Sequence, residues 1–221
     1  MNNFNPSIST TSAVSMNKVL RNTYLLLSFT LLFSALTAGI SMMLHVSHVV
    51  SIVCSFAAMG LIWFVLPRTA NSSAGIGVVF AITGLLGFGL GPILNHYLAL
   101  SNGPQLIATS LGGTGVIFLA LSGYVLTTKR DFSFMGGFLV VGLVIAVLAM
   151  VANIFLQIPA LSLALSSAII LIMSGFILFD TSRIINGGET NYINATVSLY
   201  LSIYNIFVSL LHILGIFGGD D

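Results

Sequence analysis

Seven long apolar stretches, separated by short polar connections, dominate the sequence. They cover residues 24–44, 49–66, 74–98, 106–126, 134–156, 161–179 and 197–217. A helix needs about 20 apolar residues to cross the roughly 30 Å hydrocarbon core of a bilayer, and each stretch is close to that length. The stretches do not alternate between apolar and polar residues, as the strands of a membrane β-barrel do. The pattern therefore predicts an all-α integral membrane protein with seven transmembrane helices.

The composition supports a membrane protein. Hydrophobic residues make up 57% of the 221 residues and charged residues only 5%, whereas about a quarter of a soluble domain is charged. The formal net charge of +1 is far from the strongly basic surface that nucleic-acid binding requires. We therefore expect the lipid bilayer as a partner and no nucleic acid.

The apolar stretches divide the chain into three parts. Residues 1–23 begin with a segment rich in Ser, Thr and Asn that has no apolar periodicity, which is typical of a flexible tail. Residues 24–217 form the transmembrane domain, and residues 218–221 form a short C-terminal segment. A cleaved signal peptide is a weaker interpretation of the first stretch, because its apolar run is longer than the usual ~7–15 residues.

The basic residues predict the orientation of the chain. All six follow or precede spans on one side of the membrane, at Lys18, Arg21, Arg68, Lys129, Arg130 and Arg183. The connections 45–48, 99–105 and 157–160 contain no Lys or Arg. Because cytoplasmic loops carry an excess of Lys and Arg, we expect a cytoplasmic N-terminus and a C-terminus on the opposite side.

A polar stripe distinguishes the seventh span. Ser198, Ser202, Asn205, Ser209 and His212 recur at spacings of four, three, four and three residues, which places them on one helix face. Polar side chains are costly against lipid, so the stripe should point into the bundle and the seventh helix should be central. Interhelical hydrogen bonds and a hydrated ion path are both compatible with this pattern.

Asp180 is an acidic residue at the end of the sixth span. Arg183 lies three residues further on and is the candidate ion-pair partner of Asp180. Ionisable groups at membrane depth often mark ion or proton paths, so a titratable gate near the cytoplasmic mouth is the second interpretation. The residues of the stripe, together with Asp180 and Arg183, form the predicted polar core or ion path.

Small residues four positions apart predict where helices pack closely. Gly87 and Gly91 form one such pair in the third span, and Gly142 and Ala146 form another in the fifth. Pairs of this kind let helix backbones approach each other in lipid.

No motif in the sequence indicates catalysis, a cofactor or a metal. A His-Glu-x-x-His helix is missing, and the single cysteine, Cys54, excludes a Cys-based cluster. His45 and His48 lie three residues apart in a connection, but two histidines without a carboxylate form a weak metal site. We therefore expect a protein that is not an enzyme and that binds no cofactor.

Four segments carry a resemblance to a known family. Residues 18–24 (KVLRNTY), 83–98 (TGLLGFGLGPILNHYL), 150–161 (MVANIFLQIPAL) and 179–211 (FDTSRIINGGETNYINATVSLYLSIYNIFVSLL) resemble the YccA branch of the Bax inhibitor-1 family. The resemblance covers nearly the whole chain from Lys18 onward. It implies a seven-helix bundle whose seventh helix is enclosed by the other six, in a bacterial inner membrane. With the orientation expected from the basic residues, the C-terminus is then periplasmic.

The resemblance also implies a partner and a role. Proteins of this branch associate with FtsH, an ATP-dependent AAA membrane protease, and as poor substrates they occupy it and spare other proteins. The wider family is associated with a pH-sensitive leak of calcium ions through a pair of aspartates. Asp180 matches the first aspartate, whereas the position of the second holds Ser202. This departure makes a calcium leak the weaker alternative.

Overall fold

The structure is a computed structural model that describes the backbone of residues 6–218 and the side chains of residues 18–218. Its elements, in chain order, are α1 (Pro6–Met43), α2 (His48–Gly60), the π-helical turn η1 (Leu61–Val65), α3 (Leu66–Thr69), α4 (Ala74–Leu98), α5 (Gly103–Thr128), the 3-10 turn η2 (Ser133–Met135), α6 (Gly136–Leu156), α7 (Pro159–Ile185) and α8 (Tyr192–Gly218).

Seven helical segments of the described chain are long and apolar enough to cross a membrane, with α2, η1 and α3 together forming the second. The predicted all-α fold with seven spans is therefore confirmed. The last two spans are longer than hydropathy indicated, because α7 continues to Ile185 and α8 begins at Tyr192. Polar residues at these ends, such as Thr181 and Thr196, are buried by neighbouring helices, so the helix continues past the apolar run.

The start of α1 differs from the expected flexible tail. The helix begins at Pro6, so the segment predicted to be flexible over residues 1–23 is helical from residue 6 onward. Proline is well suited to the first turn of a helix, because the N–H that it lacks has no partner there. Extending a helix that is already nucleated by a membrane span is also much easier than starting a new one. Residues 1–5 and 219–221 lie outside the described residues.

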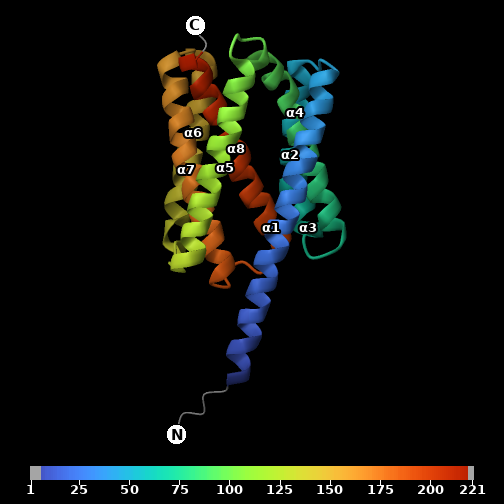
Figure 1. Cartoon of the computed structure of the whole chain (residues 1–221), viewed down its shortest axis with the longest axis vertical. Coiled ribbons are helices and arrows are strands. Elements are labelled where there is room, and N and C mark those ends of the chain that lie inside the picture. Colours follow the sequence, from blue (N-terminus) through green and yellow to red (C-terminus); the bar gives the residue numbers. More distant parts are fainter. Residues whose placement is uncertain (1–5, 219–221) are drawn as a thin grey trace.

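α8 packs against four of the other spans and crosses the bundle obliquely (Figure 1). Its partners are α1, α4, α5 and α7, while α2 packs mainly against α4, and α6 against α7. Leu199, Ile206 and Leu211 of α8 each belong to a different hydrophobic cluster and are fully buried. α8 thus connects the α1–α4 side of the bundle to the α5–α7 side.

The small-residue pair of α4 lies in a tight helix contact. A Cβ atom at Gly87 would clash with the backbone carbonyl of Ser34 on α1, and one at Gly91 would clash with Ser41. α1 and α4 therefore approach each other as closely as their backbones allow.

The pair of α6 packs less tightly. A Cβ atom at Gly142 would lie 3.5 Å from Ile172 of α7, which is an ordinary van der Waals distance. Ala146 is buried beside Ile169 and Met173 in the α6–α7 contact.

The basic residues gather at one end of the bundle. The span of α1 begins at Lys18, Arg68 lies in α3, Lys129 follows α5, and Arg183 is in the last turn of α7. Figure 1 shows these helix ends on the side where α1 enters the bundle, with the end of α8 on the opposite side. We call the former side the basic end.

Candidate functional site

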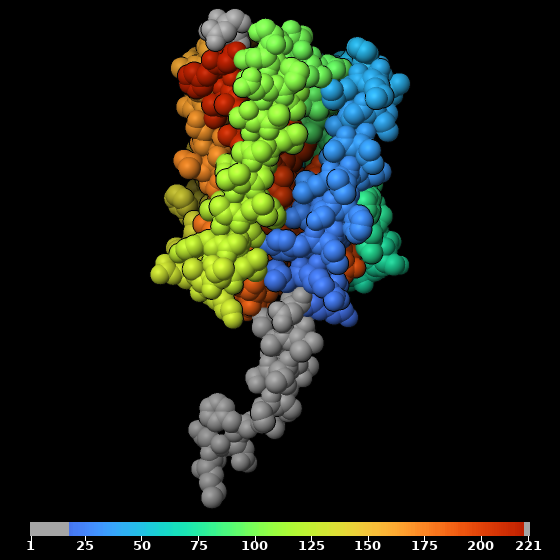
Figure 2. All heavy atoms as spheres, viewed as in Figure 1, coloured from blue at the N-terminus to red at the C-terminus, as the bar shows by residue number. Residues whose placement is uncertain are grey.

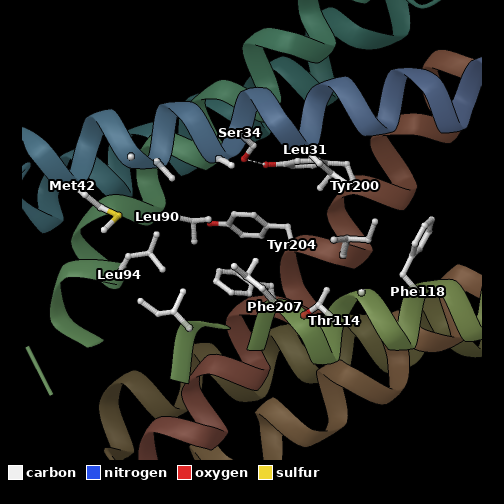
Figure 3. Close-up of a pocket in the computed structure, with 17 residues that line it drawn as sticks. Leu31, Ser34, Met42, Leu90, Leu94, Thr114, Phe118, Tyr200, Tyr204 and Phe207 are labelled. Atoms are coloured by element: carbon white, nitrogen blue, oxygen red, sulfur yellow. Dashed lines mark hydrogen bonds between the residues drawn. The ribbon is translucent and has the colours of Figure 1, made fainter. Parts of the chain in front are cut away.

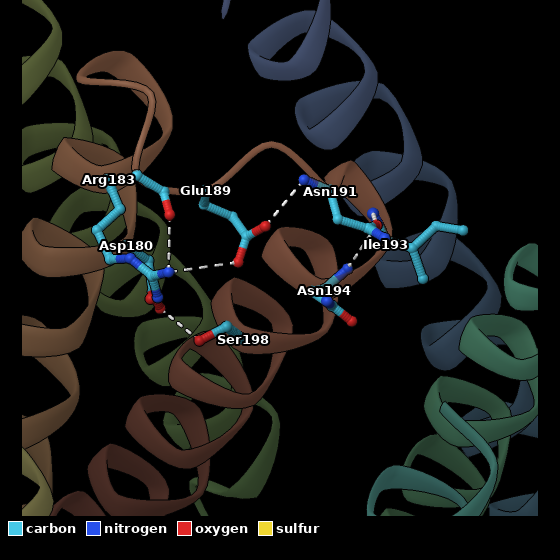
Figure 4. Close-up of polar contacts among 8 residues, drawn as sticks. Asp180, Arg183, Glu189, Asn191, Ile193, Asn194 and Ser198 are labelled. Atoms are coloured by element: carbon cyan, nitrogen blue, oxygen red, sulfur yellow. Dashed lines mark hydrogen bonds and ion pairs between the residues drawn. The ribbon is translucent and has the colours of Figure 1, made fainter. Parts of the chain in front are cut away.

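The acidic residue Asp180 faces α8 at the basic end. Its side chain is buried, and the Ser198 hydroxyl of α8 donates a hydrogen bond to its Oδ2 atom at 2.5 Å (Figure 4). α7 and α8 form an antiparallel hairpin that reverses over residues 186–191, so the two residues face each other although they are 18 positions apart in the chain. The hydroxyl that Asp180 contacts is thus that of Ser198, one helical turn before Ser202.

Arg183 does not form the ion pair with Asp180 that its spacing predicted. Its guanidinium lies 3.8 Å from Glu189, donates to the Gly188 carbonyl at 2.8 Å, and lies over the Phe179 ring. The reason is the turn after α7. The chain reverses at Gly187, whose φ is 75°, and this brings Gly188 and Glu189 into contact with the guanidinium. The prediction of an Asp180–Arg183 pair was wrong because it considered α7 alone.

The turn between α7 and α8 also joins a third part of the bundle. Glu189 accepts a hydrogen bond from the Asn191 backbone, and the Asn191 side chain accepts one from the Ile193 backbone at 2.9 Å (Figure 4). The Asn191 amide donates to the carbonyl of Ala70, beyond α3. Sequence analysis missed Glu189 and Asn191, because it began the seventh span at residue 197. In the structure α8 begins at Tyr192, so Asn191 directly precedes the helix, where a capping asparagine is typical.

The polar stripe of α8 divides between two kinds of contact. At its two ends, Ser198 bonds to Asp180, and His212 Nδ1 lies 2.8 Å from the Ser166 hydroxyl, so both ends connect α8 to α7. In the middle, the Asn205 amide donates to a carbonyl of its own helix. Ser202 and Ser209 are both buried. The contacts at the ends are the interhelical hydrogen bonds of the first interpretation.

Further polar contacts tie α1 to the rest of the bundle. The Tyr200 hydroxyl of α8 lies 2.6 Å from the Ser34 hydroxyl and donates to the Thr83 carbonyl of α4 at 3.3 Å. Nearer the basic end, the Tyr24 hydroxyl bonds to Ser122 of α5. These residues could not be paired from sequence, because up to 166 positions separate the partners.

The connection between α5 and α6 is anchored beside the same hairpin. Asp131 accepts hydrogen bonds from Ser133 and from the Ser182 hydroxyl of α7, and Ser182 accepts one from the Phe132 backbone. The hydrogen bonds from Ser133, with a smaller contribution from Ser182, hold the pKa of Asp131 below its usual range. Asp131 therefore stays ionised at neutral pH.

Replacing Asp180 should destabilise the α7–α8 hairpin. Asp180→Leu removes the acceptor and leaves the Ser198 hydroxyl beside an apolar side chain, so we expect a loss of about 1–3 kcal/mol in the free energy of unfolding. Asp180→Asn retains an acceptor oxygen and should lose less. Thermal unfolding in detergent micelles measures both variants.

A double variant provides the control for this hydrogen bond. Asp180→Leu combined with Ser198→Ala should lose less than the sum of the two single changes, because both break the same contact. Fully additive losses would contradict a bond between the two side chains.

Together, the spans and the hydrogen-bonded hairpin define a polytopic helical membrane protein with a buried polar site between α7 and α8. A sequence model of the family described as inhibitor of apoptosis-promoting Bax1 matches residues 16–219. The chain therefore belongs to this family, the Bax inhibitor-1 family.

Three relatives span nearly the same length as this chain. The modulator of FtsH protease YccA from Escherichia coli K12 is 57% identical over 210 residues, which cover 95% of each chain. An uncharacterized membrane protein of Vibrio cholerae is 51% identical over 99% of this chain and 98% of its own. An uncharacterized protein of Pseudomonas aeruginosa is 47% identical, over 92% of this chain and 91% of its own. None of these three names describes an enzyme.

Proposed function

We propose that the protein modulates an FtsH-type, ATP-dependent protease in a bacterial inner membrane. The observation that carries the proposal is the 57% identity, over 95% of both chains, to a relative named as a modulator of that protease. In this role the protein engages the protease, resists rapid degradation, and so leaves less protease for other membrane substrates.

The packing of α1 explains why degradation from the N-terminus would be slow. Pulling on α1 must separate Gly87 and Gly91 of α4 from the α1 backbone and break the bond between Ser34 and Tyr200. Each span that leaves the bilayer also exposes apolar surface and backbone groups that must be solvated again. A protease that pulls on this end must therefore break the contacts of α1 with α4 and α8 as well as unfold α1 itself.

The proposal includes an orientation, with the basic end in the cytoplasm. It rests on the gathering of Arg68, Lys129 and Arg183 at the end where α1 enters, since basic residues are enriched on the cytoplasmic side. This orientation places the N-terminus on the side of the protease motor. Reporter fusions at the two chain ends should report opposite sides of the membrane.

Two measurements test the proposed function. A tagged copy, solubilised from native membranes with a mild detergent, should co-purify the protease, and raising its level should lengthen the half-life of an unrelated membrane substrate. The matched control is a seven-span membrane protein of another family at equal abundance. Failure to co-purify, together with an unchanged substrate half-life, would reject the proposal.

A leak for cations is the second candidate function. The observation that favours it is the buried acid Asp180 beside Ser198, on the basic-end side of the polar stripe. Against it stands Ser202, at the position where the family resemblance places a second acid. A serine at that position carries no charge, so the coupled proton binding of the acid pair that the resemblance implies is missing there.

We expect calcium flux through the unmodified protein in liposomes to be weak and nearly constant between about pH 6 and 8, because Ser202 supplies no second acid to pair with Asp180 along α8. Ser202→Asp should introduce a pH-dependent flux, and adding Asp180→Asn should abolish it. A strong, pH-gated flux in the unmodified protein that disappears with Asp180→Asn alone would show that the leak is the better assignment.

A further inference from the structure

A groove separates α1 from α5 on one face of the bundle. Its volume is about 420 Å³, and α4 and α8 form its floor. Figure 2 shows the hollow between the two outer helices, and Figure 3 shows its lining. The residues that characterise the lining are Leu31, Ala38, Leu90, Leu111, Tyr204 and Phe207.

The groove lies in one half of the membrane. Along α1 it runs from Leu31, near the middle of the span Lys18–Met43, to Met42 at the far end. With a rise of 1.5 Å per residue this length is about 16 Å, which is close to half of the roughly 30 Å hydrocarbon core. The groove therefore matches the leaflet that faces away from the basic end.

The groove is continuous with the lipid-facing surface. Leu111, on the α5 side, is 57% exposed, and Ala35 on the α1 side is also exposed. Towards the basic end, the Tyr24 hydroxyl bonds to Ser122, and its ring lies 5.9 Å from that of Phe118, so α1 and α5 meet there. The groove is thus closed near the midplane and open to the hydrocarbon of one leaflet.

The polar atoms of the lining are largely satisfied by the protein. The Ser34 hydroxyl pairs with Tyr200, and the Thr114 hydroxyl donates to the Ser110 carbonyl of its own helix at 2.7 Å. The Tyr204 hydroxyl points into the groove and makes no hydrogen bond within the described part of the chain (Figure 3). An occupant therefore meets mainly methyl, methylene and aromatic surface.

The length of the groove decides between a transmembrane helix and a single acyl chain. A transmembrane helix crosses the whole hydrocarbon core of roughly 30 Å, whereas the groove ends near the midplane, where Tyr24 meets Ser122 and Phe118. One acyl chain of a phospholipid occupies a single leaflet, about half of that core, and the groove has this length and an apolar lining. We propose that the groove binds one acyl chain of a membrane phospholipid from the leaflet opposite the basic end.

Two glycines of α5 provide a matched test. A Cβ atom at either Gly115 or Gly112 would meet no heavy atom within 4 Å, so both positions have room for a larger residue. Gly115 lines the groove, whereas Gly112 lies outside the lining. Gly115→Leu therefore fills the groove, and Gly112→Leu adds the same side chain to the same helix elsewhere.

The experiment is native mass spectrometry of protein released from nanodiscs of phosphatidylethanolamine and phosphatidylglycerol. The unmodified protein and Gly112→Leu should each retain one phospholipid. Gly115→Leu should lower the ratio of lipid-bound to lipid-free protein about fivefold or more, equivalent to a loss of about 1 kcal/mol in binding. If Gly115→Leu fails to fold, Gly39→Leu fills the groove from α1, where a Cβ atom also meets nothing within 4 Å.

A third variant separates an acyl chain from an occupant with a polar group at this depth. Tyr204→Phe removes the hydroxyl and retains the ring, so retention of a phospholipid should be unchanged. A large loss of the bound molecule in this variant would instead indicate an occupant that accepts a hydrogen bond, and would overturn the proposal. Equal retention by Gly115→Leu and Gly112→Leu, or a retained mass that is not a phospholipid, would also overturn it.

Discussion

Gly87→Ala and Gly91→Ala should each lower the free energy of unfolding by about 1–3 kcal/mol, because each added methyl overpacks the contact between α1 and α4. In an ordinary helix, replacing glycine by alanine has the opposite effect and stabilises by about 0.5–1 kcal/mol. The sign of the change is therefore diagnostic. At Gly87 the new methyl would meet the carbonyl of Ser34, and at Gly91 it would meet Ser41.

Gly77→Ala is the matched control on the same helix. Gly77 is exposed and its Cβ would meet no atom within 4 Å, so this change should leave stability unchanged or raise it. Thermal unfolding in one detergent compares the three variants directly. Stabilisation by Gly87→Ala or Gly91→Ala would mean that α1 and α4 are further apart than the structure shows.

Deleting residues 2–15 should lengthen the lifetime of the protein severalfold in cells that contain the protease. A processive protease must engage a segment that it can unfold, and an isolated helix of this length is marginally stable in water. In Figure 1 the first turns of α1 extend beyond the other helices at the basic end. The segment 1–17 also carries no charged residue. We propose that this segment is the handle by which the protease engages the protein.

Two controls make the deletion interpretable. In cells without the protease, the truncated and complete proteins should have the same lifetime and the same membrane insertion. A Gly-Ser segment of equal length in place of residues 2–15 should restore rapid turnover, since a flexible chain can be gripped. Equal turnover of the truncated and complete proteins in the presence of the protease would exclude the segment as the handle.

Hydropathy identified the spans of this protein but not how their polar residues pair. The spacing of polar residues placed Ser198 and His212 on one face of α8, and both contact α7. The same kind of spacing predicted an ion pair between Arg183 and Asp180. In the structure the turn at Gly187 brings Glu189 to Arg183, which forms its ion pair there. Spacing along one helix predicts a shared face, but a partner on another segment depends on how the chain reverses.

The sequence by itself determined the membrane class, the seven spans and the placement of all basic residues on one side of these spans. Each of these follows from the free energy of transferring a residue to hydrocarbon or across it, which depends on local composition. Only the tertiary structure decided that Tyr200 meets Ser34 and that α1 and α5 part to form a groove. These features depend on the depth and rotation of each helix relative to its neighbours, which packing across the whole bundle sets.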